Sequence, residues 1–336
     1  MSRAYEQLLR PALFALDPER SHHLALGSLR FASRHPALLA SLRRFQPAGH
    51  PVKLFGLEFP NPVGLAAGFD KNGLALPAWE ALGFGFVEVG TVTARAQPGN
   101  PPPRIFRYPA QKALINRLGF NNEGADVIAA RLARLRAGGR SPRVPIGINL
   151  GKSKATPLPE ATADYLYSFR QMHEFADYVV LNVSSPNTPG LRSLQEEGSL
   201  RDLLRAIAEA NREVRKPVLL KIAPDLSAAE LDGIVTVCEQ FGVAGIVATN
   251  TTLDHISVPS AQDESGGLSG QPLHDKSNAI IRALRARTNL ALIGVGGIFD
   301  AASAREKLEA GAQLLQLYTG FVYRGPTLLH EIVSAL

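Results

Sequence analysis

The chain has 336 residues, of which 45% are apolar and 20% are charged, and it contains one cysteine. This composition excludes a disordered chain and a small fold held by disulfides, and it fits one large α/β domain with a short addition. The net charge is +6, and residues 1–50 carry seven arginines against three carboxylates. This excess favours a nucleic acid or an anionic membrane surface as partner, although an ordinary solvated helix face explains it equally well.

The N-terminal residues have the pattern of two amphipathic helices, over 5–16 and 21–33, with leucines at helical spacing. Asp17 or Ser21 is expected to cap the second helix. The stretch FQPAGHP at 45–51 ends this pattern and divides the chain into a helical segment, 1–45, and a main domain, 46–336. We expect the helical pair to pack on the main domain, or to lie in a membrane interface and form the mouth for an apolar ligand.

The main domain alternates short apolar runs with helical segments. This alternation predicts a parallel sheet with right-handed crossovers, and eight repeats favour a closed (β/α)8 TIM barrel. An open doubly wound sheet is the alternative, but the first run lacks the G-x-G-x-x-G turn that would favour it. The runs are residues 63–68, 84–91, 144–151, 178–185, 218–224, 245–251, 290–297 and 314–320.

Polar side chains gather where these runs end, and in a barrel those ends surround one site. The set lacks the parts of a two-carboxylate glycosidase, a zinc hydrolase or a Ser-His-Asp acyl transferase. Amide, hydroxyl and ammonium groups instead suit a planar heterocycle rich in carbonyl and N–H groups. The residues are Lys71, Thr91, Asn149, Asn182, Ser185, Asn187, Lys221, Thr249, Asn250, Thr251, Gly296, Gly297, Tyr318 and Thr319.

Four further segments point to a ligand. GVGGI at 294–298 and YTG at 318–320 each precede a helical pattern, which predicts a phosphate site unless these glycines serve tight packing alone. INRLGFNNEG at 115–124 and GLSGQPL at 267–273 are polar loops that we expect to contact the ligand, with capped turns as the alternative. The eight histidines show no metal-ligand spacing, so no metal is expected, and Cys238 lies in a helical pattern typical of an inert core residue.

These motifs, in this order, resemble the class 2 dihydroorotate dehydrogenases, the membrane-associated, quinone-reducing branch of that family. The residues that carry the resemblance are AAGFDKNG, INRLGFNNEG, INLGKSK, LNVSSPNTPGLR, LLKIAPDL, ATNTT, GGLSGQPL, GVGGI and QLYTGF. The resemblance runs from the N-terminal helices to the final strand. It implies a (β/α)8 barrel that holds FMN and oxidises dihydroorotate to orotate in pyrimidine synthesis.

The resemblance also implies roles for individual residues. Ser185 would be the base that removes the C5 proton while C6 gives hydride to flavin N5, whereas class 1 enzymes use a cysteine in this loop. Thr188 is a hypothetical proton relay. Substrate would contact Lys71, Asn116, Arg117, Leu118, Gly119, Phe120, Asn182, Asn187, Asn250 and Thr251. FMN would contact Ala67, Gly68, Phe69, Asp70, Lys71, Thr91, Asn149, Asn182, Lys221, Thr249, Gly270, Gly297, Tyr318 and Thr319.

In class 2 enzymes the N-terminal helical pair forms a quinone tunnel, and His22 and Arg107 match the expected quinone contacts.

The chain has neither a span of about 18 apolar residues nor a targeting presequence, so it resembles a bacterial enzyme resting on the cytoplasmic face of the cell membrane. No nucleic-acid partner is expected. Two alternative functions fit the sequence less well. A tRNA-dihydrouridine synthase would need a cysteine acid and an RNA-binding domain, and neither is evident in the sequence. A non-enzymatic flavin- or lipid-binding barrel would not need Ser185 and Lys71, which are both present.

Overall fold

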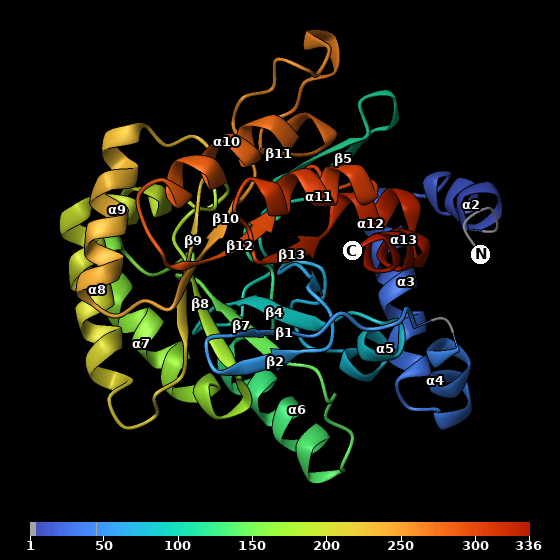
Figure 1. The fold of residues 1–336 in the computed structure, drawn as a ribbon, viewed down its shortest axis with the longest axis horizontal. Helices are drawn as coiled ribbons and strands as arrows, with labels where there is room; N and C mark the ends of the chain where they lie inside the picture. Colours follow the sequence, from blue (N-terminus) through green and yellow to red (C-terminus); the bar gives the residue numbers. More distant parts are fainter. Residues whose placement is uncertain (1–4, 45) are drawn as a thin grey trace.

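Eight parallel strands close into a barrel in the computed structural model, which describes residues 5–44 and 46–336 (Figure 1). Their order around the barrel is β10-β12-β13-β3-β4-β7-β8-β9, and β9 pairs with β10 to close it. The predicted (β/α)8 barrel is therefore confirmed, and each apolar run supplies one strand. The strands are β3 (Val63–Leu65), β4 (Phe86–Val92), β7 (Ile146–Leu150), β8 (Tyr178–Asn182), β9 (Val218–Ile222), β10 (Gly245–Ala248), β12 (Ala291–Val295) and β13 (Leu314–Leu317).

Every residue of the eight barrel strands is buried, because one face packs inside the barrel and the other packs against helices. Alternate residues of a strand point inward, so Phe86, Tyr178 and Leu219 meet in one apolar layer. A hairpin, β1 (Val52–Leu54) and β2 (Leu57–Phe59), precedes the first barrel strand, and its Phe59 ring packs edge-on against Phe86 at 5.3 Å. The amino-terminal end of the barrel is therefore an apolar floor.

Helices cover the outside of the barrel, as the βα pattern predicts. Two of them begin at capping boxes: Ser227 with Glu230, and Asp300 with Ser303. Cys238 is fully buried on α9, and burial raises the pKa of its thiol to about 12, as expected for an inert core residue. The helices are α5 (Leu76–Ala81), α6 (Ala125–Ala137), α7 (Ala161–Met172), α8 (Glu197–Ala210), α9 (Ala228–Gln240), α10 (His274–Arg285), α11 (Ala301–Glu309), α12 (Thr319–Arg324) and α13 (Pro326–Ala335).

The N-terminal segment lies beside α5, α12 and α13 (Figure 1). It contains a π-helical turn (Tyr5–Leu9), α2 (Arg10–Phe14), α3 (Pro18–Ala32) and α4 (Pro36–Arg43). The two predicted helical regions are present, and the cap of α3 is Asp17, whose carboxylate accepts from two backbone N–H groups at 2.9 and 3.0 Å. Helix α4 was not predicted. Residues 1–4 and 45 of the predicted segment 1–45 lie outside the described residues.

Three strands outside the barrel form a separate antiparallel sheet: β5 (Ile105–Tyr108), β6 (Ala113–Asn116) and β11 (Gly267–Gly270). Both segments predicted as polar loops contribute to it, since Asn116 of the first pairs with Gly267 of the second. Their pairing partners are about 150 residues apart, which explains why local patterns did not reveal the sheet. Within residues 5–44 and 46–336, no helix combines the length and the apolar character needed to cross a bilayer.

Candidate active site

The inward-facing positions change from apolar to polar toward the carboxyl ends of the strands. On β9, Leu219 belongs to the apolar layer and Lys221, two residues later, lines a cavity. Tyr178 and Asn182 on β8 follow the same rule. Because the side-chain period of a strand is two, a polar residue an even number of positions after an inward apolar one must also face inward. The barrel therefore has an apolar floor and a polar mouth.

A cavity at this mouth brings together most of the residues predicted for substrate and cofactor. They come from seven strand ends and from β6 and β11, so only barrel closure makes them neighbours. The predicted residues that line it are Ala67, Gly68, Lys71, Thr91, Asn116, Leu118, Gly119, Phe120, Asn182, Ser185, Asn187, Lys221, Thr249, Asn250, Thr251, Gly270, Gly297, Tyr318 and Thr319.

Four predicted residues lie elsewhere. Asn149 is fully buried behind the lining, where it accepts from Thr91 Oγ1 at 2.6 Å. The guanidinium of Arg117 donates to Glu264 at 2.8 Å and stacks over Phe106, away from the cavity. The carboxylate of Asp70 accepts from two N–H groups of the α5 start and from Trp79 Nε1 at 3.0 Å, which gives it a structural role. Phe69 faces a second cavity.

Several buried oxygens in the first cavity lack a protein partner. Thr249 Oγ1, Thr251 Oγ1 and Gln316 Oε1 line it, and none has a hydrogen-bond partner among the described residues. Three lining glycines, Gly68, Gly270 and Gly297, have φ of 96°, 104° and 74°, a region that L side chains rarely adopt. Unpaired polar atoms and exposed glycine backbone fit a polar, planar ligand with a phosphate, and these residues therefore fit the predicted FMN.

Two lysines provide the positive charge of the cavity. Burial lowers the pKa of Lys71 to about 8, and its ammonium donates to the Gly68 carbonyl at 2.9 Å. Burial also lowers the pKa of Lys221, and the carboxylate of Glu88 opposes this shift. Sequence reasoning missed Glu88 and Gln316, although each is a polar residue inside an otherwise apolar strand. A single polar residue inside an apolar strand pattern could have identified both as candidate site residues.

Ser185 stands on the loop after β8 and lines the cavity. Its Oγ accepts from the Asn187 N–H at 3.2 Å, which leaves its own hydroxyl proton available for donation. Asn187 Nδ2 in turn donates to Asn116 Oδ1 at 3.3 Å. In the described part of the chain, no histidine or carboxylate hydrogen-bonds Ser185 Oγ, and the buried hydroxyl of Thr188 has no partner.

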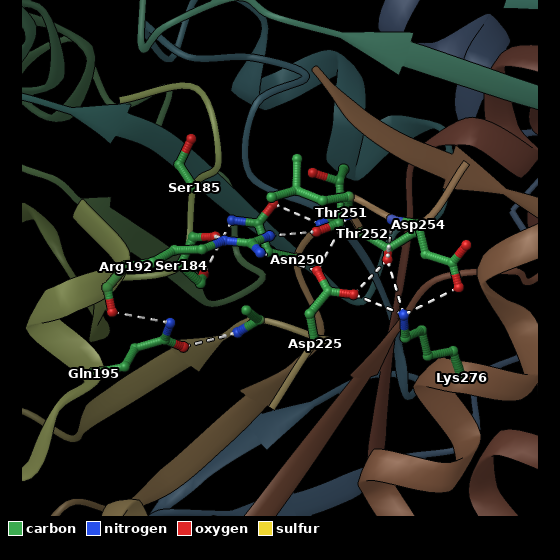
Figure 2. A network of polar contacts seen from close by, with 12 residues as sticks. Ser184, Ser185, Arg192, Gln195, Asp225, Asn250, Thr251, Thr252, Asp254 and Lys276 are labelled. Atoms are coloured by element: carbon green, nitrogen blue, oxygen red, sulfur yellow. Dashed lines mark hydrogen bonds and ion pairs between the residues drawn. The ribbon is translucent and has the colours of Figure 1, made fainter. Parts of the chain in front are cut away.

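Arg192 joins the Ser185 loop to the end of β10 (Figure 2). Its guanidinium donates to the Ser184 carbonyl at 3.1 Å, to the Thr251 carbonyl at 2.9 Å and to Asp225 at 2.9 Å. Lys276 reaches the same carboxylate at 2.8 Å. Figure 2 shows the Ser185 side chain pointing away from this network. Arg192 ends the motif LNVSSPNTPGLR, but no local pattern indicated its bonds to Asp225 and Thr251, which lie 33 and 59 residues away in the sequence.

A second cavity, of about 600 Å³, lies under the N-terminal helices. Its lining is mainly apolar and includes both predicted quinone contacts, His22 and Arg107. Burial, and next the charge of Lys71, lower the pKa of His22 to about 3, so this imidazole is neutral at physiological pH. Arg107 stacks over Phe14 at 4.6 Å and donates to the Leu13 carbonyl at 3.1 Å, which ties β5 to the N-terminal segment.

The two cavities adjoin, because four residues line both: Asn116, Leu118, Ser269 and Tyr318. The Tyr318 ring packs against Phe69 at 5.2 Å, and its hydroxyl donates to the Gly68 carbonyl at 3.4 Å. A ligand in the barrel mouth and one in the apolar cavity would thus meet across this shared wall. No group of three or more potential metal ligands occurs within the residues that the structure describes.

Comparisons with known proteins agree with this arrangement. The model of the family described as Dihydroorotate dehydrogenase matches residues 51–336. The Dihydroorotate dehydrogenase (quinone) of Gloeobacter violaceus is 52% identical over 334 residues, which cover 98% of this chain and 93% of that protein. The Dihydroorotate dehydrogenase (quinone) of Salinispora arenicola is 51% identical over 340 residues, which cover 98% of this chain and 98% of that protein. The ligand-free DHODH of Eimeria tenella aligns with a TM-score of 0.84 and 36% identity, covering 94% of this chain and 93% of its own.

Proposed function

The chain belongs to the dihydroorotate dehydrogenase family, in its class 2 or quinone-dependent branch, and from this membership we propose that it oxidises dihydroorotate to orotate and reduces a quinone, as a step of de novo pyrimidine synthesis. The observation that carries the proposal is the pair of adjoining cavities, one polar and one apolar, with Tyr318 in the wall between them. This arrangement provides separate sites for a polar substrate and an apolar electron acceptor.

FMN, when bound at the barrel mouth, would accept hydride from substrate C6 at N5 and return both electrons to the quinone. The glycine backbone of 296–297 and the Thr319 hydroxyl are suited to its phosphate, and the unpaired oxygens of Thr249 and Gln316 are suited to its polar ring edge. Lys221 supplies a buried positive charge beside that ring site. Asn149, behind the lining, acts by holding Thr91.

The substrate is proposed to bind against the amides of Asn116, Asn187 and Asn250, with Lys71 facing its carboxylate. Asn187 and Asn116 already share a hydrogen bond at 3.3 Å, which orients both amides for a planar ligand. Arg117 is not placed for direct contact by its side chain, and its effect would come through the loop that it anchors to Glu264.

Ser185 is proposed as the base that removes the C5 proton of dihydroorotate. A lone serine is a weak base, since its alkoxide is strongly disfavoured in water. Lys71 and the surrounding amides lower this barrier by stabilising charge that develops in a water-poor site. The unpaired, buried hydroxyl of Thr188, three residues along the same loop, supports its proposed role as a relay to solvent.

The apolar cavity is proposed as the quinone site, with the neutral imidazole of His22 and the guanidinium of Arg107 near the quinone oxygens. The same helical region has exposed apolar side chains, including Leu24 and Phe31, and its sequence also contains Arg20, Arg30 and Arg34. Such a face suits an anionic bilayer surface. We therefore propose peripheral attachment to the cytoplasmic side of the cell membrane, with segment 1–45 as the membrane part and 46–336 as the FMN barrel.

The test is the visible spectrum of the purified protein, recorded without oxygen. Addition of dihydroorotate is expected to bleach a bound flavin band, and a ubiquinone analogue is expected to restore it, whereas fumarate is not. A flavin band that dihydroorotate leaves unchanged would contradict the substrate assignment. Equal recovery with fumarate would contradict the quinone assignment alone.

A further inference from the structure

Glu88 is a charged residue in the interior of the barrel that the proposed chemistry leaves unused. It lies on β4, two positions after Phe86 of the apolar floor, and is fully buried. Its carboxylate accepts from Asn149 Nδ2 at 2.8 Å and from Gln316 Nε2 at 2.5 Å. The ammonium of Lys221 lies 4.0 Å away. All three of these groups are donors, so both oxygens of Glu88 act as acceptors.

The carboxylate determines which way two side-chain amides face. Because it accepts only, Asn149 and Gln316 must turn their NH2 groups toward it and their oxygens away from it. The Gln316 oxygen is thereby left unpaired among the described residues, in the lining of the polar cavity. The Asn149 oxygen accepts from Thr91 Oγ1 at 2.6 Å.

The hydrogen bonds across the cavity lining keep the same donor-to-acceptor direction. With its proton committed to Asn149, Thr91 Oγ1 accepts from Asn182 Nδ2 at 3.0 Å. Asn182 Oδ1 then accepts from Asn250 Nδ2 at 3.3 Å. Each donor in this series points toward Glu88. One buried carboxylate therefore orients polar groups on four strand ends.

Glu88 also balances a charge. Lys221 is buried in the cavity wall, and no other carboxylate in the described chain lies within ion-pair distance of it. The formal charge of the Lys221–Glu88 pair is therefore zero rather than the +1 of Lys221 alone, and Lys71 remains as the second lysine of the cavity. A reduced flavin carries one more negative charge than an oxidised flavin near neutral pH, so this balance affects the two forms differently.

We propose that Glu88 is a positioning residue for the flavin, which fixes the donor direction of the polar lining and offsets the charge of Lys221, so that the flavin's reduction potential is held down. The inference rests on the proposed FMN site and deepens it. Glu88 itself need not touch the flavin, because it acts through Asn149, Gln316 and Lys221.

The test compares Glu88→Gln with the wild type by spectroelectrochemical titration of bound flavin and by fluorescence titration with FMN. The variant is expected to favour the reduced form by about tenfold, which raises the two-electron potential by about 30 mV. Each oxygen of Glu88 accepts one N–H group, and the variant replaces one of these oxygens with an NH2 donor, so FMN affinity is also expected to fall. Glu58→Gln, at an exposed position of β2, is the control and should change neither value.

Glu88→Asp provides a second measurement that stays valid if Glu88→Gln does not fold. It keeps the charge but shortens the side chain, so the potential is expected to stay near the wild-type value while FMN affinity falls. Unchanged potential in Glu88→Gln, or unchanged FMN affinity in Glu88→Asp, would overturn the inference. Wild-type protein that binds no FMN would instead overturn the proposed function.

Discussion

The polar cavity at the barrel mouth and the apolar cavity under the N-terminal helices are supported in different ways. The polar cavity is built on eight mutually paired strands and an internal hydrogen-bond network that runs from Glu88 to Asn250. The apolar cavity depends on a wall that side-chain contacts attach to the outside of the barrel, among them Glu19 with Arg104 at 2.6 Å and Tyr5 with the Val322 carbonyl at 2.8 Å. One site is integral to the fold, and the other is added to it.

From this difference we expect the two proposed half-reactions to be physically separable. The proposed substrate chemistry depends on groups whose relative positions barrel closure fixes. Acceptor binding depends on burial of apolar surface, which tolerates variation in shape. Changes in one cavity should therefore leave the other half-reaction intact.

The largest effect is expected for Ser185→Ala. Loss of a general base should slow flavin reduction by dihydroorotate by on the order of 10²- to 10⁴-fold, whereas reoxidation of reduced flavin by quinone should stay unchanged. Stopped-flow spectroscopy measures both steps. Ser193→Ala, on the same loop, is the matched control, and Thr188→Val should give a smaller decrease if it relays the proton. Equal slowing of both half-reactions would break the proposed separation.

Removal of residues 1–45 is expected to affect the other half-reaction. The truncated protein should keep its rate of flavin reduction, because no barrel strand is lost. Its kcat/KM for a quinone analogue should fall by about tenfold or more, since the apolar wall of the cavity is gone. Binding to vesicles that contain anionic lipid should also decrease. Equal quinone turnover with and without the segment would exclude it as the quinone site.

Arg192→Gln tests whether the polar cavity depends on its network beyond the barrel strands. Without the guanidinium, the Ser184 and Thr251 carbonyls lose a shared donor and the Ser185 loop loses its tie to β10. Loss of these charge-assisted bonds should weaken orotate binding and slow flavin reduction by about tenfold each. Quinone KM should not change. Arg205→Gln, at an exposed pair on α8, is the control, and a quinone KM that rises in parallel would indicate general unfolding.

The smallest effect is a pH dependence set by Lys71. Burial lowers the pKa of Lys71 to about 8 in the free protein, so its ammonium is charged below that pH and neutral above it. Affinity for the orotate anion should therefore be constant below pH 8 and weaken as the pH rises further. Flavin spectral titrations from pH 6 to about 9.5 measure it. Lys71→Arg, which stays charged, should remove the decline; a decline that persists would assign it to another group.

The barrel and most of the polar cavity could be predicted from the amino-acid sequence. Strand periodicity and burial are local properties, so the eight apolar runs located the eight strands. Since strand ends in a parallel barrel converge, the polar residues there, Ser185 and Lys71 among them, could be grouped before any coordinates were known. The sequence narrows the helix cap to Asp17 or Ser21, because a cap acts on the next three residues, and the structure identifies it as Asp17.

Tertiary structure alone decided the features that join distant segments. Pairing of β6 with β11, the bonds of Arg192 to Asp225 and Thr251, and the donors around Glu88 each connect residues far apart in sequence. No local pattern encodes such partners. The direction of a side chain also could not be predicted from the sequence. Asp70 and Arg117 belong to the predicted motifs, but Asp70 faces α5 and Arg117 faces Glu264. The sequence determines which groups reach the barrel mouth, because that follows from periodicity, whereas the partners of each group follow from three-dimensional packing.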